Sequence, residues 1–428
     1  MEYADIDDAA SHGDLEFIKG IRATDKFLYL TERAMDAAAE NGHLHVVQWL
    51  HANTPEGCTV AAMDGAATNG HSDVVRWLHE NRQEGCTTQA LDGAASRGNL
   101  DMVQWLHENR TEGATVAAMD SAASYGHLPL VQWLHQFRTE GCSPKAMDSA
   151  AAHGFLPIVE WLHANRPEKC TEEAIKGAIK YDFLDVVRFL IDHDYFVASN
   201  CRIYLHYAAK CGHIDIVQHF LLLQPTPLTP EAQDSIVAAL DVAARYGHLN
   251  VVGFLFQCVG RASPNALDSA AAKGHLDIVA FLHQHNQPCT TRALDKASEG
   301  GFANTVSFLL QHRNEGCTTH AMDYAASNGH LEVVQLLAAS PATCSTHALR
   351  SAAAGGHQDI VSILLTKYPH ANWPYHEAIK AATFHGHRSI ADTLEMELVS
   401  NGMAKRLNVH DNTVAAASAN PTGLARTA

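Results

Sequence analysis

The stretch TVAAMDGAATNGHSDVVRWLHENRQEGC, Thr59–Cys86, is followed directly by TTQALDGAASRGNLDMVQWLHENRTEGA, Thr87–Ala114. The two stretches match along their whole length, and their central glycines, Gly70 and Gly98, are 28 residues apart. Self-similarity at a fixed period of this size is the signature of a repeat protein. The repeat therefore decides the fold.

The repeat extends along most of the chain. Counted from the central glycine, fourteen units cover roughly residues 2–400, mostly 27 to 30 residues apart. Asp182 fills the glycine position in one unit, and the interval from Gly212 to Gly247 is longer, at 35 residues. The thirteen central glycines are Gly13, Gly42, Gly70, Gly98, Gly126, Gly154, Gly212, Gly247, Gly274, Gly301, Gly329, Gly356 and Gly386.

Each unit predicts two helices. A Thr eleven residues before the glycine, such as Thr59, is a good N-cap for the first helix, and the glycine ends that helix in a left-handed conformation. Apolar residues at 8, 7, 4 and 3 positions before the glycine lie on one helical face. The second helix carries L-x-V-V-x-W-L-H, as in Leu44–His51, and a four-residue link follows.

Neither helix can bury its apolar face alone, so the units must stack on one another. The sequence thus predicts an all-α helical-repeat solenoid of about fourteen helix pairs. The links are too short for a β-hairpin, and we expect no strand between units.

The segment A-A-x-x-G-H-L-x-V-V-x-x-L resembles the ankyrin repeat, and it recurs, for example, in Ala66–Leu78 and Ala325–Leu337. Two features depart from the ankyrin pattern. The ankyrin T-P-L-H-x-A becomes x-A-M/L-D-x-A, so that Asp64 stands where the ankyrin His would. The period is about five residues short of the ankyrin 33, and the missing residues are those of the β-hairpin. The resemblance implies an ankyrin-like protein-interaction scaffold.

The pattern divides the chain into four parts. We expect N-terminal repeats over residues 1–191, an irregular repeat with a Pro-rich insert over 192–236, and C-terminal repeats over 237–400. The insert is Gln224–Pro230, which forms a loop in this interpretation. Residues 401–428 have no periodicity and are predicted to be a disordered tail.

Charge limits the class of partner. Lys and Arg total 30 against 47 Asp and Glu, a formal net charge of −17 at pH 7. Binding to a phosphate backbone requires the opposite balance, so we expect no nucleic-acid partner. The acidity instead favours a basic protein partner.

The N-terminus is acidic and lacks the apolar core of a signal peptide, and the longest apolar stretches, such as Val251–Phe256, are far too short to span a membrane. Ten Cys without a secretory signal fit a reducing compartment. We expect a cytoplasmic monomer that does not bind membranes.

No phosphate-binding, zinc-protease, C-x-x-C or nucleophile-elbow motif occurs in the sequence, so we expect neither an enzyme nor a cofactor. Side chains also recur in register along the repeats. We interpret the recurring Cys and Trp residues as packing groups, the His residues as structural hydrogen-bonding groups, and the Asp six before each glycine as acceptors for backbone N–H groups of the next unit. An alternative for the Asp row is an acidic stripe that binds a basic partner. A second alternative is a metal site in a set of C-terminal histidines, His370, His376, His385 and His387.

The position just before the central glycine varies while its neighbours stay constant, as a surface adapted to a partner would. We predict that this position forms a partner-binding ridge near the concave face, with Tyr and Arg as anchors. The predicted function is a non-enzymatic scaffold that binds a protein partner, with a substrate-recognition adaptor or a His-rich metal-binding or enzymatic protein as alternatives. The predicted partner-binding residues are Arg97, Tyr125, His153, Tyr181, Tyr246 and Lys273.

Overall fold

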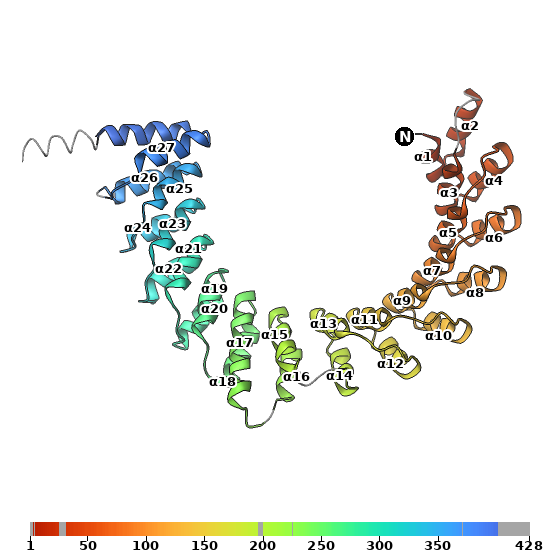
Figure 1. The fold of residues 1–428 in the computed structure, drawn as a ribbon, viewed down its shortest axis with the longest axis horizontal. Coiled ribbons are helices and arrows are strands. Elements are labelled where there is room, and N and C mark those ends of the chain that lie inside the picture. Colours follow the sequence, from red (N-terminus) through yellow and green to blue (C-terminus); the bar gives the residue numbers. More distant parts are fainter. Residues whose placement is uncertain are drawn as a thin grey trace, which may run out of the picture. The chain divides into compact units, whose positions relative to one another are not determined.

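A computed structural model describes residues 3, 5–24, 31–195, 200–224, 226–369 and 371–400. Throughout these residues the regular structure is helical and contains no strand (Figure 1). The prediction of an all-α solenoid of stacked helix pairs is therefore confirmed. The predicted tail, 401–428, lies outside the described residues.

The chain divides into two compact units. Unit 1 comprises residues 1–208 and 218–220, and unit 2 comprises residues 209–217 and 221–428. The predicted boundaries at 191, 236 and 400 remain predictions. One helix pair, α15 (Cys201–Cys211) and α16 (Ile214–Leu222), is shared between the two units.

The helices of unit 1 come in pairs, one pair for each repeat. They are α1 (Ile6–Ser11), α2 (Leu15–Thr24), α3 (Glu32–Glu40), α4 (Leu44–Asn53), α5 (Val60–Asn69), α6 (Ser72–Asn81), α7 (Thr88–Ser96), α8 (Leu100–Asn109), α9 (Val116–Ser124), α10 (Leu128–Phe137), α11 (Pro144–Ala152), α12 (Leu156–Asn165), α13 (Glu172–Lys180) and α14 (Leu184–Asp192).

Unit 2 continues the same pairing, and residues 388–400 are also helical. Its helices are α17 (Pro230–Tyr246), α18 (Leu249–Val259), α19 (Pro264–Ala271), α20 (Leu276–Gln284), α21 (Thr291–Glu299), α22 (Ala303–His312), α23 (Thr319–Ser327), α24 (Leu331–Ala339), α25 (His347–Ala354), α26 (Gln358–Lys367) and α27 (Tyr375–Phe384).

Within each unit the helices form two layers (Figure 1). From α1 to α13 and from α17 to α27, each odd-numbered helix packs against the odd-numbered helices of the neighbouring repeats, and the even-numbered helices form the second layer. The buried side chains follow the predicted positions, with Ala62, Met63, Ala66 and Ala67 on α5. Hydrophobic burial between repeats is thus supplied mainly by small residues, which let the odd-numbered helices approach closely.

The Pro-rich insert differs from its prediction in one respect. The structure uses its last residues to start a helix rather than a loop, because Thr229 caps α17 and Pro230 occupies the first turn. Helix α17 has 17 residues, against 9 in α13. Most of the extra length between Gly212 and Gly247 therefore extends this helix.

The central glycine is required for two reasons, as Gly42 illustrates. Its φ of +77° is left-handed, and a Cβ atom at this position would lie 2.4 Å from Nδ1 of His71 in the next repeat. Rings of the following repeat therefore lie directly over these glycines. In at least five of the nine repeats with His at this place, Nε2 also lies within hydrogen-bond distance of a carbonyl oxygen of the preceding repeat, as for His43 and Ser11 at 3.0 Å.

A second contact between repeats is made by the Asp that recurs six residues before the central glycine, and we call this contact the Asp clamp. Asp64 is buried, its Oδ1 accepts the backbone N–H of Thr87 (2.8 Å), and its Oδ2 accepts the Thr87 hydroxyl (2.7 Å). The same hydroxyl oxygen accepts the N–H of Gln89 and so caps α7. The clamp ties one odd-numbered helix to the start of the next.

All ten Asp residues at this position hold the Thr or Ser of the following repeat, which confirms their predicted structural role. Eight accept both the backbone N–H and the hydroxyl, while Asp7 and Asp241 accept the hydroxyl. The pairs are Asp7–Thr31, Asp36–Thr59, Asp64–Thr87, Asp92–Thr115, Asp120–Ser143, Asp148–Thr171, Asp241–Ser263, Asp268–Thr290, Asp295–Thr318 and Asp323–Ser345.

The even-numbered layer has its own ladder of contacts. The indole of Trp77 is half-buried and meets the ring of His51 in the preceding repeat edge-on, with centroids 5.2 Å apart. Arg82 in the following link lies 3.2 Å from Nδ1 of the same histidine and pairs with Glu84. The Trp residues are therefore packing groups of the even-numbered layer, as the sequence predicts.

We expect the substitution Asp64→Ala to destabilise the neighbouring helices α5 and α7 by about 2–3 kcal/mol, because it leaves the Thr87 N–H without an acceptor and removes a hydrogen bond to a charged group. Hydrogen exchange of the amides in these two helices measures the effect. The exposed Glu80→Ala on α6 is the matched control and should change exchange free energies by less than about 0.5 kcal/mol. Equal effects of the two substitutions would contradict the structural role of the clamp.

The carboxylates in the links between repeats should make the folded chain less stable in acid. Burial raises the pKa of the Glu112 carboxyl, but hydrogen bonds from Arg110 and from backbone N–H groups outweigh it and hold the pKa at about 2. Because this pKa is depressed in the folded state, the contribution is present above the ordinary value of 4.5 and is lost as the pH falls from 4.5 to about 2. Urea unfolding of the native chain and of Glu112→Gln should show a difference at neutral pH that shrinks across this interval. A constant difference would refute the assignment.

Candidate binding surface

The six predicted partner-binding residues all lie at the ends of odd-numbered helices and are exposed. In unit 1, Arg97, Tyr125, His153 and Tyr181 are the C-caps of α7, α9, α11 and α13. The rings of Tyr125 and Tyr181 are 63% and 54% exposed, so neither belongs to the core. We call these four residues the unit 1 ridge.

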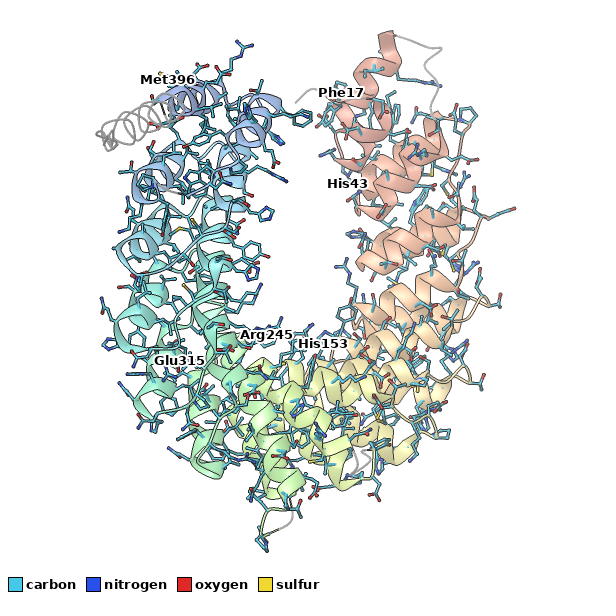
Figure 2. The ribbon with its side chains drawn as sticks, turned by 60° about the vertical axis from the view of Figure 1, so that its left-hand side comes forward. Phe17, His43, His153, Arg245, Glu315 and Met396 are labelled. Carbon is cyan, nitrogen blue, oxygen red and sulfur yellow. The ribbon has the colours of Figure 1, made fainter. Side chains whose placement is uncertain are left out.

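Contacts within unit 1 orient several of these side chains. Arg97 donates from Nη2 to Asn69 Oδ1 in the preceding repeat (2.9 Å), and His153 Nδ1 lies 2.8 Å from the carbonyl oxygen of Ser149. His153 is labelled in Figure 2. The Tyr181 ring lies under the ammonium group of Lys180, 4.8 Å from the ring centroid. The rings of Tyr125 and Tyr181 are therefore exposed, while hydrogen bonds within unit 1 hold the side chains of Arg97 and His153.

In unit 2 the remaining two predicted residues occupy the same repeat position. Tyr246 is the last residue of α17 and is 46% exposed, and its ring lies 5.3 Å from Nζ of Lys210. Lys273 is exposed at the end of α19 and lines a cavity that sequence analysis did not identify.

This cavity has a volume of about 540 Å³ and is lined by residues of α17, α19, α21 and α23. Its size falls in the range of ligand-binding pockets. We call it the basic groove, because four of its lining side chains are Arg or Lys. Its polar rim is formed by Arg245, Asn265, Lys273, Arg292, Lys296 and Asn328. Arg245 is labelled in Figure 2.

The charges of the basic groove are mostly uncompensated. Arg245, Lys273 and Arg292 are exposed, and none of them forms an ion pair with a described residue. Lys296 does pair with Glu299, at 2.5 Å. The other acid of the cavity, Asp268, is occupied by its clamp to Thr290. A local excess of positive charge therefore lies on a chain of net charge −17.

The position five before the central glycine differs between the groove and the most closely packed repeats. In α5, α7 and α13 it is Gly, and the neighbouring odd-numbered helices pack more closely there. A Cβ atom on Gly93 would lie 2.0 Å from Oγ1 of Thr68. The equivalent residues of α19 and α21 are Ser269 and Lys296, and both line the cavity.

Sequence analysis missed Arg245, Arg292 and Lys296 because it compared only the position before the glycine. Positions nine, five and two before the glycine share one face of each odd-numbered helix, since their spacings are four and three residues. Across α5, α7 and α9 these positions carry Ala, Gly, Thr, Gln and Ser, whereas α21 carries Arg292, Lys296 and Glu299. A comparison of that face between repeats could have found the groove.

Sequence analysis left a metal site as an alternative. In the described part of the chain, no three His, Cys, Asp or Glu residues are placed to hold a metal ion. His370 lies outside the described residues. All ten Cys are free thiols. In a separate observation, none of the described helices has the length and apolar character needed to cross a membrane.

Comparisons with known proteins agree with this fold. A family profile described as ankyrin repeats in three copies matches residues 34–120, 147–227 and 267–347, and one for ankyrin repeats in many copies matches 119–163. The comparison with curated proteins yields no match.

Among solved structures, the pentatricopeptide repeat protein PPR10 from maize has a TM-score of 0.30 and 11% identity, covering 91% of this chain and 67% of that one. The same protein in complex with an 18-nt RNA element has a TM-score of 0.31 and 11% identity, covering 93% and 74%. Likeness at these scores carries no functional argument.

The stacked helix pairs, the left-handed glycines and the shared apolar positions define a helical-repeat protein of the ankyrin type. The family matches span more than half of the sequence. The chain belongs to the ankyrin repeat family, with the projecting hairpins absent from its described links.

The thiols of the Cys row should react slowly in the native chain. Burial raises the pKa of Cys58, Cys86 and Cys142 from 9.0 to about 11, which leaves roughly 100-fold less thiolate at neutral pH than an ordinary thiol has. Titration with a disulfide reagent should give a fast phase that includes the exposed Cys258 and loses amplitude in Cys258→Ser. All thiols should react rapidly in denaturant. A fast phase that contains the three buried thiols would contradict their role as packing groups.

Proposed function

We propose that this chain is a non-enzymatic scaffold that binds a protein partner along the ends of its odd-numbered helices. The observation that carries the proposal is that one exposed position varies between repeats while the structural positions recur. The apolar positions are kept in four consecutive repeats, and the glycine and the clamp in the first three of them, whereas the exposed position before the glycine changes to Arg97, Tyr125, His153 and Tyr181.

The chemistry of the unit 1 ridge supports a protein partner. Tyr and Arg are enriched among the residues that contribute most to protein interfaces, because their large side chains combine apolar area with hydrogen bonding. Two of the four are exposed Tyr rings on alternate repeats, at α9 and α13. Tyr246 and Lys273 continue the same position in unit 2.

Charge supports a protein rather than a nucleic acid as the partner. The net charge of −17 disfavours a phosphate backbone and steers basic protein surfaces toward the chain. The Asp clamps are a poor source of that attraction, since their carboxylate oxygens already accept hydrogen bonds from the next repeat. Exposed acids such as Asp73, Asp101 and Asp185 are better placed to attract a basic partner.

The ten free thiols support a reducing compartment, and we place the scaffold in the cytoplasm. An adaptor that presents substrates to a larger assembly uses the same ridge, and a partner that carries enzymatic activity would favour that role. We also propose that the chain is a monomer, because the described surface carries many exposed charges, which oppose self-association.

We expect the double substitution Tyr125→Ala, Tyr181→Ala to weaken partner binding by at least about 2 kcal/mol, because two anchors of the ridge are lost. Both side chains are exposed, so thermal stability should change little. Affinity purification of the full chain, followed by titration of the recovered partner with native and variant protein, measures the effect.

Phe137→Ala is the matched control, because Phe137 is an exposed aromatic residue at the end of α10 in the other layer. It should leave binding unchanged. If the double variant binds the partner as tightly as the native chain, the ridge is the wrong surface.

A further inference from the structure

We propose that the basic groove of unit 2 binds a short, extended, acidic segment of a protein. The proposal goes beyond the function assigned to the unit 1 ridge, whose four residues all lie outside the groove and which is expected to attract partners of the opposite charge; Lys273 is the one predicted partner-binding residue that also lines the groove. Either one can therefore fail without the other.

The charge of the basic groove selects an anionic occupant. Arg245 on α17, Lys273 at the end of α19 and Arg292 on α21 come from three successive odd-numbered helices and line one cavity. Each is exposed and forms no ion pair with a described residue. Cations that are gathered in this way and lack internal partners are stabilised by carboxylates from outside.

The shape of the groove suits a peptide main chain. Ser269, Ala272 and Gly300 line it between the charged residues, and these small side chains allow a backbone to approach closely. The side chain of Asn265 makes no hydrogen bond to a described residue and offers both an amide donor and a carbonyl acceptor. An extended segment can thus pair its carboxylates with the rim and its peptide groups with the amide.

The extent of the positive charge favours a peptide over a nucleic acid. A nucleic acid carries charge along its whole length and needs a continuous basic track. Here three unpaired cations are confined to about 540 Å³, and the chain around them has a net charge of −17. A short acidic segment gains the local attraction without extending over the surrounding acidic surface.

The test uses the full chain and a fluorescein-labelled peptide, Glu-Gly repeated four times, in which all four carboxylates point to the same side when the peptide is extended, because Glu is every second residue. Fluorescence anisotropy should show saturable binding that weakens with salt. The matched peptide, Gln-Gly repeated four times, should bind at least about tenfold more weakly. Equal binding of the two peptides, or no saturable binding of the first, overturns the proposal.

The double substitution Arg245→Glu, Arg292→Glu should weaken binding of the acidic peptide at least about tenfold. The control is Arg33→Glu, Arg76→Glu, which makes the same change in net charge at exposed positions of α3 and α6. Arg245→Gln, Arg292→Gln is a milder second variant, and circular dichroism checks that each variant is folded. An equal loss in the control pair overturns the proposal, because binding would then depend only on net charge.

Two further measurements separate the remaining interpretations. A single-stranded RNA of eight nucleotides that binds more tightly than the peptide, and that loses affinity in Arg245→Glu, Arg292→Glu, would assign the groove to nucleic acid and overturn the proposal. Tyr125→Ala, Tyr181→Ala should bind the acidic peptide as the native chain does. If that variant loses peptide affinity, the peptide is bound by the unit 1 ridge and the groove proposal is wrong.

Discussion

The Asp clamp is the contact that fixes the register in which successive repeats stack. Apolar burial alone would let a helix of small residues slide along its neighbour, because Ala positions at 8, 4 and 3 before the glycine are nearly interchangeable. The two oxygens of Asp64 fix one register, since they must meet the N–H and the hydroxyl of Thr87 together. The same Thr caps α7, so that helix capping and repeat stacking rely on a single side chain.

The clamp changes where the repeat pattern is irregular. The clamp position is Lys176 in α13 and His206 in α15, and the division between the two compact units falls shortly afterwards, within residues 209–221. Near the C-terminus, Arg350 takes the position in α25 and pairs with Glu377 of α27 at 3.7 Å. In a solenoid, where each repeat contacts only its neighbours, a lost clamp is not compensated from a distance.

Much of the frame could be predicted from the sequence, because each of its parts has a local physical cause. Thr59 caps a helix and Gly70 ends it, and the apolar spacing places Met63 on the face that the neighbouring repeats bury. The basic groove could not be predicted in this way. It depends on the side chains that α17, α19 and α21 bring together around one cavity, and a single repeat does not contain that information.

The short links shift the candidate binding sites to the helices. With no hairpin in the described links, the surface open to a proposed partner consists of the exposed faces and ends of the odd-numbered helices rather than projecting loops. A helix face is rigid, so its specificity comes from side chains at a few positions, and a change of one residue also changes the helix spacing. Lys296 adds a charge to the groove and stands at the position that is Gly in α5, α7 and α13. One position of the odd-numbered helices therefore bears both on how closely neighbouring helices pack and on the charge of the surface between them.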